Sequence, residues 1–300
     1  MRDVAIAAYN LSKRYPGTKK YALKGLDFDI RTGEVYGFLG PNGAGKTTTL
    51  RLFMNFIQPT LGEAKVLDMD SVVESVEVKS RIGYLPGEMS FYSKMTGGQF
   101  LQYMAQLQPP KNIAYARQLI RLFEFGTNQK IGQLSKGNRQ KLGIIAAFMH
   151  QPEVLFLDEP TSGLDPLMQE AFFELVRRTK AGGATLFISS HNLGEVQKMC
   201  DRVGFIRQGR LIAEQKVGDF SKLTKQIYDI SFADKAPLDD LRSVPKAKVT
   251  VNTPHYVTVQ VMGDLTPLFK VLARHKVNTM DRREASLEEE FLRFYRKDNK

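Results

Sequence analysis

The stretch Gly40-Pro41-Asn42-Gly43-Ala44-Gly45-Lys46-Thr47-Thr48 decides how the rest of this 300-residue chain is interpreted. Its small residues allow successive backbone N–H groups to converge on an anion, and glycine tolerates the positive φ angles that such a turn needs. Lys46 is suited to the β- and γ-phosphates of a nucleoside triphosphate, and the Thr47 hydroxyl is a suitable ligand for its Mg²⁺ ion. The pattern is that of a phosphate-binding P-loop.

The residues on both sides of the loop support this interpretation. Val35–Leu39 is a short apolar run typical of a buried strand, and Lys46–Ile57 has the apolar periodicity of a helix. Two further strands are expected before the loop, at Val4–Ala8 and Leu26–Ile30. A phosphate-binding loop requires a strand before it and a helix after it, and both are predicted here.

The middle of the chain predicts helices followed by alternating strands and helices. Gln99–Gln108 and Ala114–Phe125 carry apolar residues at three- and four-residue spacing. Val154–Leu157 and Ala184–Ser189 resemble strands, with a helix at Pro166–Lys180 between them. This alternation predicts an α/β fold with a mainly parallel sheet and a helical subdomain at about residues 89–150.

Two acidic residues follow one of these strands directly. Asp158 and Glu159 come after the apolar run Val154–Leu157, so they are expected at the carboxyl edge of the sheet, where ligands bind in open α/β folds. Asp158 is suited to hold Mg²⁺, and Glu159 is placed to accept a proton from an attacking water molecule.

The pattern changes beyond about residue 220. Tyr228, Ile230 and Phe232 alternate with polar residues, and a Thr253-Pro254-His255 turn separates two more alternating runs that predict a hairpin. Thr266-Pro267 opens one helix, and Ser286 with Glu289 forms a capping box for a last one. We therefore expect a cassette at residues 1–219 and a small α+β appendage at 220–300.

Composition limits the cellular compartments and the classes of protein that fit this chain. The single cysteine, Cys200, excludes an intrachain disulfide and fits a reducing compartment. No run approaches the roughly 18 apolar residues of a membrane-spanning helix, so we expect a protein that is soluble by itself and needs a partner for any membrane role. The net charge of +11 fits contact with nucleotides, nucleic acid or an anionic membrane surface, or simply a solvated basic surface, and it does not decide among them.

Three further motifs give the chain a family resemblance. From about Ala5 to Asp219 it resembles the ATP-binding subunit of an ABC transporter. Leu134-Ser135-Lys136-Gly137-Asn138-Arg139-Gln140 is similar to the signature motif that distinguishes this family from other P-loop NTPases. Ser162-Gly163-Leu164-Asp165 resembles the D-loop, and Ser190-His191 the switch histidine.

The resemblance implies ATP and Mg²⁺ as cofactors and a role for each matching residue. Lys46, Glu159 and His191 would be catalytic, and Thr47 and Asp158 would hold the metal. Asp165 would act in the D-loop. The ATP-binding residues would be Tyr15, Gly40, Pro41, Asn42, Gly43, Ala44, Gly45, Lys46, Thr47 and Thr48, and the residues that bind the partner's nucleotide would be Ser135, Lys136, Gly137 and Asn138.

Some of these assignments have alternatives. Tyr15 would stack on adenine, and Tyr9 and Tyr21 are nearby candidates for the same role. Ser135 is suited to cap a helix expected at Asn138–Met149 as well as to bind phosphate. His191 taken alone would more often be an ordinary surface or core histidine, but its place after the strand Ala184–Ser189 favours contact with the γ-phosphate.

Two departures from the family pattern stand out. The family usually has a glutamine that ligates Mg²⁺ and senses the membrane partner, but here Ile82-Gly83-Tyr84-Leu85-Pro86 leads into Gly87 and Glu88. Either Glu88 substitutes for that glutamine or water takes the position. The signature also has Lys136 and Asn138 where glycine and glutamine are common.

Family members pack two subunits head to tail around two ATP molecules, so this chain is expected to pair with itself or with a paralogous cassette. It would drive a separate membrane-spanning permease from the cytoplasm, as a peripheral protein on the inner face of the cell membrane. The appendage and the run Ser286–Phe294 resemble the extensions of drug- and peptide-exporter ATPases, which favours export. Met89–Met104, rich in aromatic residues, is either a surface for the permease or ordinary subdomain core.

The alternative is a soluble ABC ATPase that acts on ribosomes or nucleic acid, which the positive charge motivates. Translation-type members usually carry two cassettes and genome-maintenance members carry long coiled coils, and neither feature is visible here, so no nucleic-acid partner is expected. A regulator that only binds nucleotide would lack the acid that Glu159 supplies.

Overall fold

The computed structural model describes residues 4–218 and 225–283. The chain divides into two compact units, Met1–Glu214 and Gln215–Lys300. The change of pattern expected at residues 219/220 falls inside the second unit. Among the described residues, no helix is long and apolar enough to cross a membrane.

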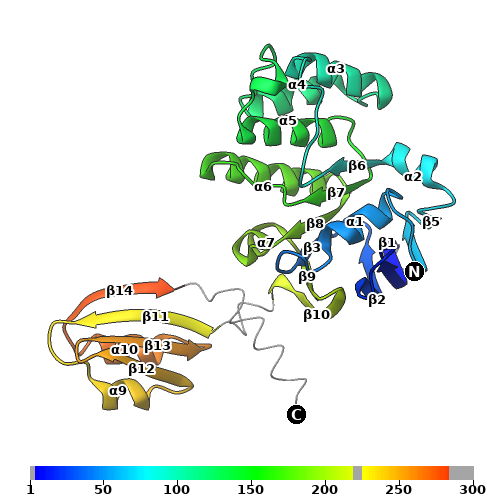
Figure 1. Ribbon diagram of the computed structural model, residues 1–300. Helices are drawn as coiled ribbons and strands as arrows, with labels where there is room; N and C mark the ends of the chain where they lie inside the picture. The colour runs from blue at the N-terminus through cyan, green and yellow to red at the C-terminus, as the bar shows by residue number, and fades with distance from the viewer. Residues whose placement is uncertain (1–3, 219–224, 284–300) are drawn as a thin grey trace. The chain divides into compact units, whose positions relative to one another are not determined.

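The first unit is built around a six-stranded sheet in the order β10-β9-β3-β8-β7-β6 (Figure 1). The neighbouring pairs β9-β3, β3-β8, β8-β7 and β7-β6 are parallel, which confirms the expected mainly parallel sheet. Its strands are β3 (Val35–Leu39), β6 (Ile82–Leu85), β7 (Val154–Asp158), β8 (Thr185–Ser190), β9 (Arg202–Arg207) and β10 (Arg210–Lys216). Every residue of β3, β7 and β8 is buried, because layers of the fold cover both faces of the central strands.

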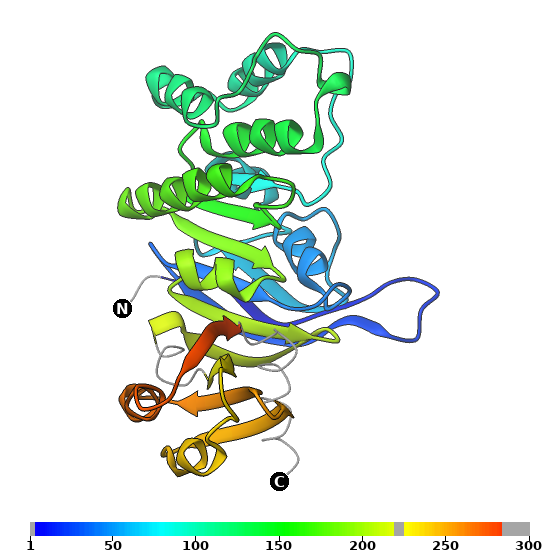
Figure 2. The same ribbon diagram turned by 90° about the vertical axis from the view of Figure 1, so that its left-hand side faces the viewer.

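A second, antiparallel sheet has the order β2-β1-β4-β5. Its strands are β1 (Val4–Arg14), β2 (Tyr21–Arg31), β4 (Leu61–Val66) and β5 (Met69–Asp70). The hairpin of β1 and β2, in dark blue, projects from the unit (Figure 2). Helix α1 (Lys46–Phe53) shares one hydrophobic core with strands of both sheets. Within this core the Phe53 ring packs edge-on against Phe28 and tilted against Phe187.

The remaining helices form two groups. Helices α3, α4 and α5 gather beyond β6 at one end of the unit, whereas α6 and α7 lie beside the central strands (Figure 1). The bounds of the helices are α2 (Ser75–Arg81), α3 (Gly97–Leu107), α4 (Ile113–Leu122), η1 (Ile131–Gln133), α5 (Lys136–Phe148), α6 (Pro166–Ala181) and α7 (Leu193–Met199).

The C-terminal end of α5 is joined closely to β6. A Cβ added at Gly83 would lie 2.3 Å from the Ala147 carbonyl oxygen, so only glycine permits this approach of strand and helix. His150, just beyond α5, has its Nε2 atom 3.1 Å from the Ile82 carbonyl oxygen. Burial lowers the pKa of this imidazole. The helical subdomain is therefore attached to the sheet through buried contacts.

The second unit is a four-stranded antiparallel sheet in the order β12-β13-β11-β14 with two helices packed against it. Its elements are β11 (Lys225–Phe232), α9 (Leu238–Ser243), β12 (Ala247–Thr253), β13 (Tyr256–Met262), α10 (Thr266–Leu272) and β14 (Val277–Arg283). The alternating side chains Tyr228, Ile230 and Phe232 enter its core together with Val257, Val259 and Val261.

Several elements predicted from the sequence are confirmed, and the bounds of two helices differ from the prediction. The strand Val35–Leu39, the helix opening at Thr266 and the hairpin after β11 are confirmed. Helix α1 ends at Phe53, before the expected Ile57, because Met54 and Asn55 already form turns. Helix α5 begins at Lys136 and not at Asn138, since Ser135 is its cap. The helix expected at Ser286 lies outside the described residues.

Candidate functional site

The P-loop connects the end of β3 to the start of α1. Gly45 has φ +116°, and a Cβ there would lie 2.5 Å from Leu23 Cδ2. A Cβ at Gly40 would lie 2.4 Å from the carbonyl oxygen of Ile206 on β9. Because both approaches exclude a side chain, the loop requires glycine at each end.

Lys46 occupies the first position of α1, and its side chain is 7% exposed. Its Nζ atom donates a hydrogen bond of 2.7 Å to the Gly40 carbonyl oxygen and lies 3.2 Å from Glu159 Oε1. The lysine on the P-loop and the acid after β7, 113 positions apart in the sequence, therefore meet in one ion pair. Such a pair holds both charged groups at the place where a triphosphate would be bound.

Thr47 and Asp158 form the second contact across the site. The Thr47 hydroxyl donates a hydrogen bond of 2.7 Å to Asp158 Oδ2, and the Ser189 hydroxyl donates to Asp158 Oδ1. Asp158 is buried because it ends strand β7, which lies between β8 and β6 in the sheet. A threonine hydroxyl and a carboxylate are the oxygen donors that Mg²⁺ prefers, so these residues fit the expected metal.

Glu159 is held in an unusual backbone conformation with φ +50°, in the left-handed region that glutamate rarely adopts. Its Oε2 atom lies 2.8 Å from His191 Nδ1. Its Oε1 atom is buried and, among the described residues, accepts no hydrogen bond, although the Lys46 ammonium is nearby. This oxygen therefore faces the Lys46 ammonium, and it becomes available to a water molecule when Lys46 turns to a phosphate.

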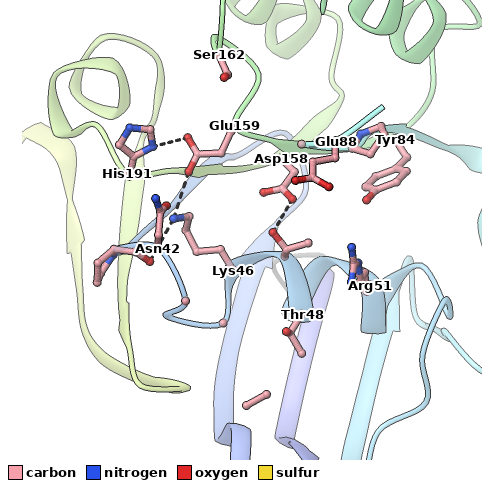
Figure 3. A pocket seen from close by; sticks show the side chains of 17 residues that line it. Asn42, Lys46, Thr48, Arg51, Tyr84, Glu88, Asp158, Glu159, Ser162 and His191 are labelled. Carbon is pink, nitrogen blue, oxygen red and sulfur yellow. Dashed lines mark hydrogen bonds and ion pairs between the residues drawn. The ribbon is translucent and has the colours of Figure 1, made fainter. Parts of the chain in front are cut away.

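These side chains line one cavity of about 550 Å³ (Figure 3). It is lined by Ala22, Pro41, Asn42, Gly43, Gly45, Lys46, Thr47, Thr48, Arg51, Tyr84, Pro86, Gly87, Glu88, Asp158, Glu159, Ser162 and His191. The structure therefore brings together most of the expected P-loop, acidic and switch residues. Gly40 and Ala44 shape the loop without lining the cavity.

Sequence reasoning missed several lining residues. Arg51 was not anticipated, although it lies three and four positions after Thr48 and Thr47 and therefore on the same face of α1. Ala22 belongs to β2, and no local signal pointed to it. Tyr84 reaches the site because β6 pairs with β7, which places the two strand ends side by side.

Tyr84 faces the acidic side of the cavity. Burial raises its pKa to about 12, helped by the negative charge of Asp158 and opposed by Arg51. The phenol is therefore neutral at physiological pH, and its hydroxyl remains a hydrogen-bond donor.

The signature residues lie at the start of α5, apart from this cavity. Ser135 is exposed, and its Oγ atom accepts a hydrogen bond of 3.2 Å from the Asn138 N–H, so the predicted capping role is confirmed. A Cβ at Gly137 would lie 2.8 Å from the carbonyl oxygen of Gly163, which places signature and D-loop in contact. Asp165 caps α6 by accepting a bond of 2.9 Å from the Met168 N–H.

Tyr15 lies in the turn between β1 and β2, with Lys13 Nζ 5.5 Å from its ring centroid. It is not among the residues that line the cavity.

Comparison with known proteins agrees with this site. A family model described as "ABC transporter" matches residues 23–162. The bacitracin transport ATP-binding protein BcrA of Bacillus licheniformis is 33% identical over 77% of this chain and 76% of its own length. The chain belongs to the ABC transporter family. As an ABC ATPase it binds ATP, and the recognised family and fold class are confirmed.

Other relatives differ in how much of this ABC ATPase they cover. A fluoroquinolones export ATP-binding protein of Mycobacterium tuberculosis is 29% identical over 96% of the chain and 92% of its own length. An uncharacterized ABC transporter ATP-binding protein of Nostoc sp. is 38% identical over 65% of the chain, which corresponds to 59% of that relative. A solved structure of an ATP-binding subunit of an ABC transporter has a TM-score of 0.66 at 27% identity, covering 72% of this chain and 91% of its own.

Proposed function

We propose that this ABC ATPase powers a separate membrane permease, as an exporter subunit that closes as a dimer on two ATP molecules and opens after hydrolysis. The observation that carries the proposal is the meeting of Lys46, Glu159 and His191 in a cavity that also contains the Thr47–Asp158 contact. Similarity to the bacitracin transport and fluoroquinolones export ATP-binding proteins supports transport out of the cell.

Each residue of the cavity has a part in this mechanism. The P-loop, Gly40 to Thr48, binds the phosphates through its backbone N–H groups, and Lys46 turns from its ion pair toward the γ-phosphate. Thr47 and Asp158 hold Mg²⁺, which when bound neutralises charge on the phosphate oxygens. Once Lys46 has turned away, Glu159 orients a water molecule through its Oε1 atom and accepts its proton.

His191 acts together with Glu159. Its Nδ1 atom is in hydrogen-bond contact with that carboxylate, and the imidazolium form, which carries a proton on each nitrogen, also donates from the other ring nitrogen to the γ-phosphate. Because the contact with Glu159 orients the ring, loss of either residue should disturb the other.

The signature residues Ser135, Lys136, Gly137 and Asn138 serve the nucleotide of a second cassette. The Ser135 oxygen already accepts the bond that caps α5, so its hydroxyl hydrogen and the N-terminus of the helix remain to contact a γ-phosphate from the other side. Asp165 supports this face through the D-loop. ATP then joins the two subunits, and loss of the γ-phosphate releases them. The side chains of this face determine whether the second subunit is another copy of the chain or a paralogue.

A groove between the sheet and the helical subdomain is the binding site for a short helix of the permease. It has a volume of about 330 Å³ and is mostly apolar, with Phe56, Met89, Phe91, Phe100 and Met104 among its lining residues. Tyr84 and Pro86 line both this groove and the nucleotide cavity, so a change at the phosphates can reach the groove through two shared residues.

The remaining assignments complete the proposal. Residues 1–219 form the cassette, with the helical subdomain at about 89–150, and residues 220–300 form the appendage. Tyr15 stacks on the adenine when the β1–β2 hairpin lies against the bound nucleotide. The subunit works in the cytoplasm on the inner face of the cell membrane, without a nucleic-acid partner.

The test is the Glu159→Gln variant, which removes the proton acceptor but keeps the shape. With Mg²⁺ and ATP this variant is expected to elute as a dimer in size-exclusion chromatography, and as a monomer without ATP. A monomer at saturating ATP would overturn the two-subunit mechanism. Purification from membranes should also recover a polytopic protein, and recovery of ribosomes or nucleic acid in its place would support the soluble ABC ATPase.

A further inference from the structure

The backbone at Glu159 is strained, with φ +50° in the left-handed region. Such a conformation persists only where the surrounding structure fixes it from several sides. The Glu159 N–H points to Ser189 on β8, 3.1 Å from its carbonyl oxygen and 3.3 Å from its hydroxyl oxygen. The Glu159 carbonyl oxygen accepts a hydrogen bond of 3.1 Å from the Ser162 N–H. With the chain held in this way, the carboxylate lies between Lys46 and His191 (Figure 3).

Pro160 and Thr161, the two residues after Glu159, are buried and are bound from two sides. From α5, the buried Gln140 donates a hydrogen bond of 2.7 Å to the Pro160 carbonyl oxygen. From α7, Glu195 accepts a hydrogen bond of 2.7 Å from the Thr161 hydroxyl at its Oε2 atom. Two helices therefore fix the dipeptide that follows the strained residue.

Glu195 also binds the segment that carries the switch histidine. The Ser190 hydroxyl donates a hydrogen bond of 3.3 Å to the same Oε2 atom. On the other side of His191, the Asn192 side chain accepts a hydrogen bond of 3.3 Å from the Glu195 N–H and so caps α7. One carboxylate oxygen of Glu195 therefore joins the chain after Glu159 to the residue before His191.

We propose that Thr161 and Glu195 are positioning residues for ATP hydrolysis. Their hydrogen bond keeps the backbone of Glu159 in its left-handed conformation and thereby keeps the carboxylate in contact with His191. Thr161 is only 4% exposed, so its hydroxyl requires an acceptor within the protein. Neither Thr161 nor Glu195 is among the residues that line the nucleotide cavity, so the pair acts through Glu159 and not on ATP. This inference rests on the proposed function, because it assumes that Glu159 accepts the proton of the attacking water.

The test separates the catalytic rate from nucleotide binding. Thr161→Val keeps the shape of the side chain but removes the hydroxyl, and Glu195→Ala removes the acceptor. Each variant is expected to lower kcat for ATP hydrolysis about 10-fold and to keep KM for ATP within about 2-fold of the wild type, because a misplaced catalytic group slows the chemical step. Thr161→Ser keeps the donor and Glu195→Gln keeps an acceptor oxygen, so both should retain most of the wild-type kcat.

A double-mutant cycle tests whether the two residues act as a unit. Because either single change already breaks the bond, the double variant of Thr161→Val and Glu195→Ala should have a kcat within about 2-fold of the slower single variant. Losses that multiply would overturn the pairing. An unchanged kcat in Thr161→Val would overturn the proposal, and so would a raised KM with an unchanged kcat, which indicates a role in nucleotide binding. A Thr161→Ser variant as slow as Thr161→Val would overturn it too.

Tyr36→Phe is the matched control within the same unit. The buried Tyr36 hydroxyl donates a hydrogen bond of 2.6 Å to Glu214, so this variant also loses a buried hydroxyl-to-carboxylate bond, but outside the cavity. It should change neither kcat nor KM. If Tyr36→Phe slowed hydrolysis as much as Thr161→Val, lost stability would explain both and the proposal would be overturned. Wild-type turnover in Glu159→Gln, in contrast, would show that the proposed function of Glu159 itself is wrong.

Discussion

The P-loop face of the first unit buries its key side chains, whereas the signature face presents its key side chains to solvent. Lys46 and Asp158 are buried and are positioned by the ends of strands β3 and β7. Ser135 and Lys136 are exposed at the start of α5, and their local contacts are only a helix cap and the D-loop. The first face is nearly complete within one chain, and the second is complete only when another molecule is added.

This difference predicts which step, nucleotide binding or pairing of two chains, a substitution on each face should affect. Changes on the P-loop face alter binding of nucleotide to a single chain, since the charges that hold it are all in that chain. Changes on the signature face leave that binding intact and affect only the step that needs two chains. The two faces are connected inside the subunit by Gln140 of α5, which donates a hydrogen bond of 2.7 Å to the Pro160 carbonyl oxygen next to Glu159.

The largest effect is expected for Lys46→Ala on the P-loop face. Removal of the ammonium leaves Glu159 without its ion-pair partner and the phosphates without their buried cation, so ATP hydrolysis should fall at least about 100-fold. Phosphate release and equilibrium ATP binding are the measurements. Lys65→Ala, at a half-buried lysine of β4 outside the cavity, is the control and should keep wild-type turnover. Unchanged turnover in Lys46→Ala would mean that the site is elsewhere.

A smaller and more selective effect is expected for Ser135→Ala on the signature face. Loss of the hydroxyl should slow hydrolysis by about 10- to 100-fold and prevent ATP-dependent dimerisation, while ATP binding to the single chain stays unchanged. Loss of the cap should also lower the free energy of unfolding by about 1 kcal/mol.

Thr96→Ala separates the two consequences of that change. Thr96 caps α3 in the same subdomain by the same kind of bond, 3.2 Å from the Gln99 N–H, but it does not belong to the signature. The Thr96→Ala substitution should lower the free energy of unfolding by about 1 kcal/mol without changing the rate of ATP hydrolysis. If Thr96→Ala slowed hydrolysis as much as Ser135→Ala, loss of subdomain stability would explain both, and the comparison between the two faces would no longer hold.

The smallest effect is expected at His150, where the C-terminal end of α5 meets strand β6. Burial lowers the pKa of its imidazole below that of the unfolded chain, so the folded state favours the neutral ring. This contribution to stability is fully present above the ordinary histidine pKa of about 6.5, and it is lost as the pH falls from there through the lowered pKa of the folded state. Urea unfolding followed by circular dichroism at pH 7.5 and pH 5.0 should show a larger loss in the wild type than in His150→Gln. Equal losses would mean that His150 does not titrate differently on unfolding.

The sequence alone was enough for the P-loop, for the strand that ends at Asp158, for the helix cap at Ser135 and for the helix that opens at Thr266-Pro267. These features depend on contiguous residues, such as a glycine-rich loop, a short apolar run or a capping side chain, whose preferences are expressed within a few positions. Strands β4, β6 and β9 were missed because they are stabilised by partners distant in the sequence, which a local pattern does not reveal.

Only the tertiary structure decided which chemical groups meet. The pairing of Lys46 with Glu159, the contact of Glu159 with His191 and the approach of Gly87 to Asp158 all follow from the order in which parallel strands lie side by side. The entry of Arg51 into the cavity also depends on how α1 packs against the sheet. The reason is physical: a motif determines the shape of its own few residues, whereas distances between motifs are set by packing of the whole unit.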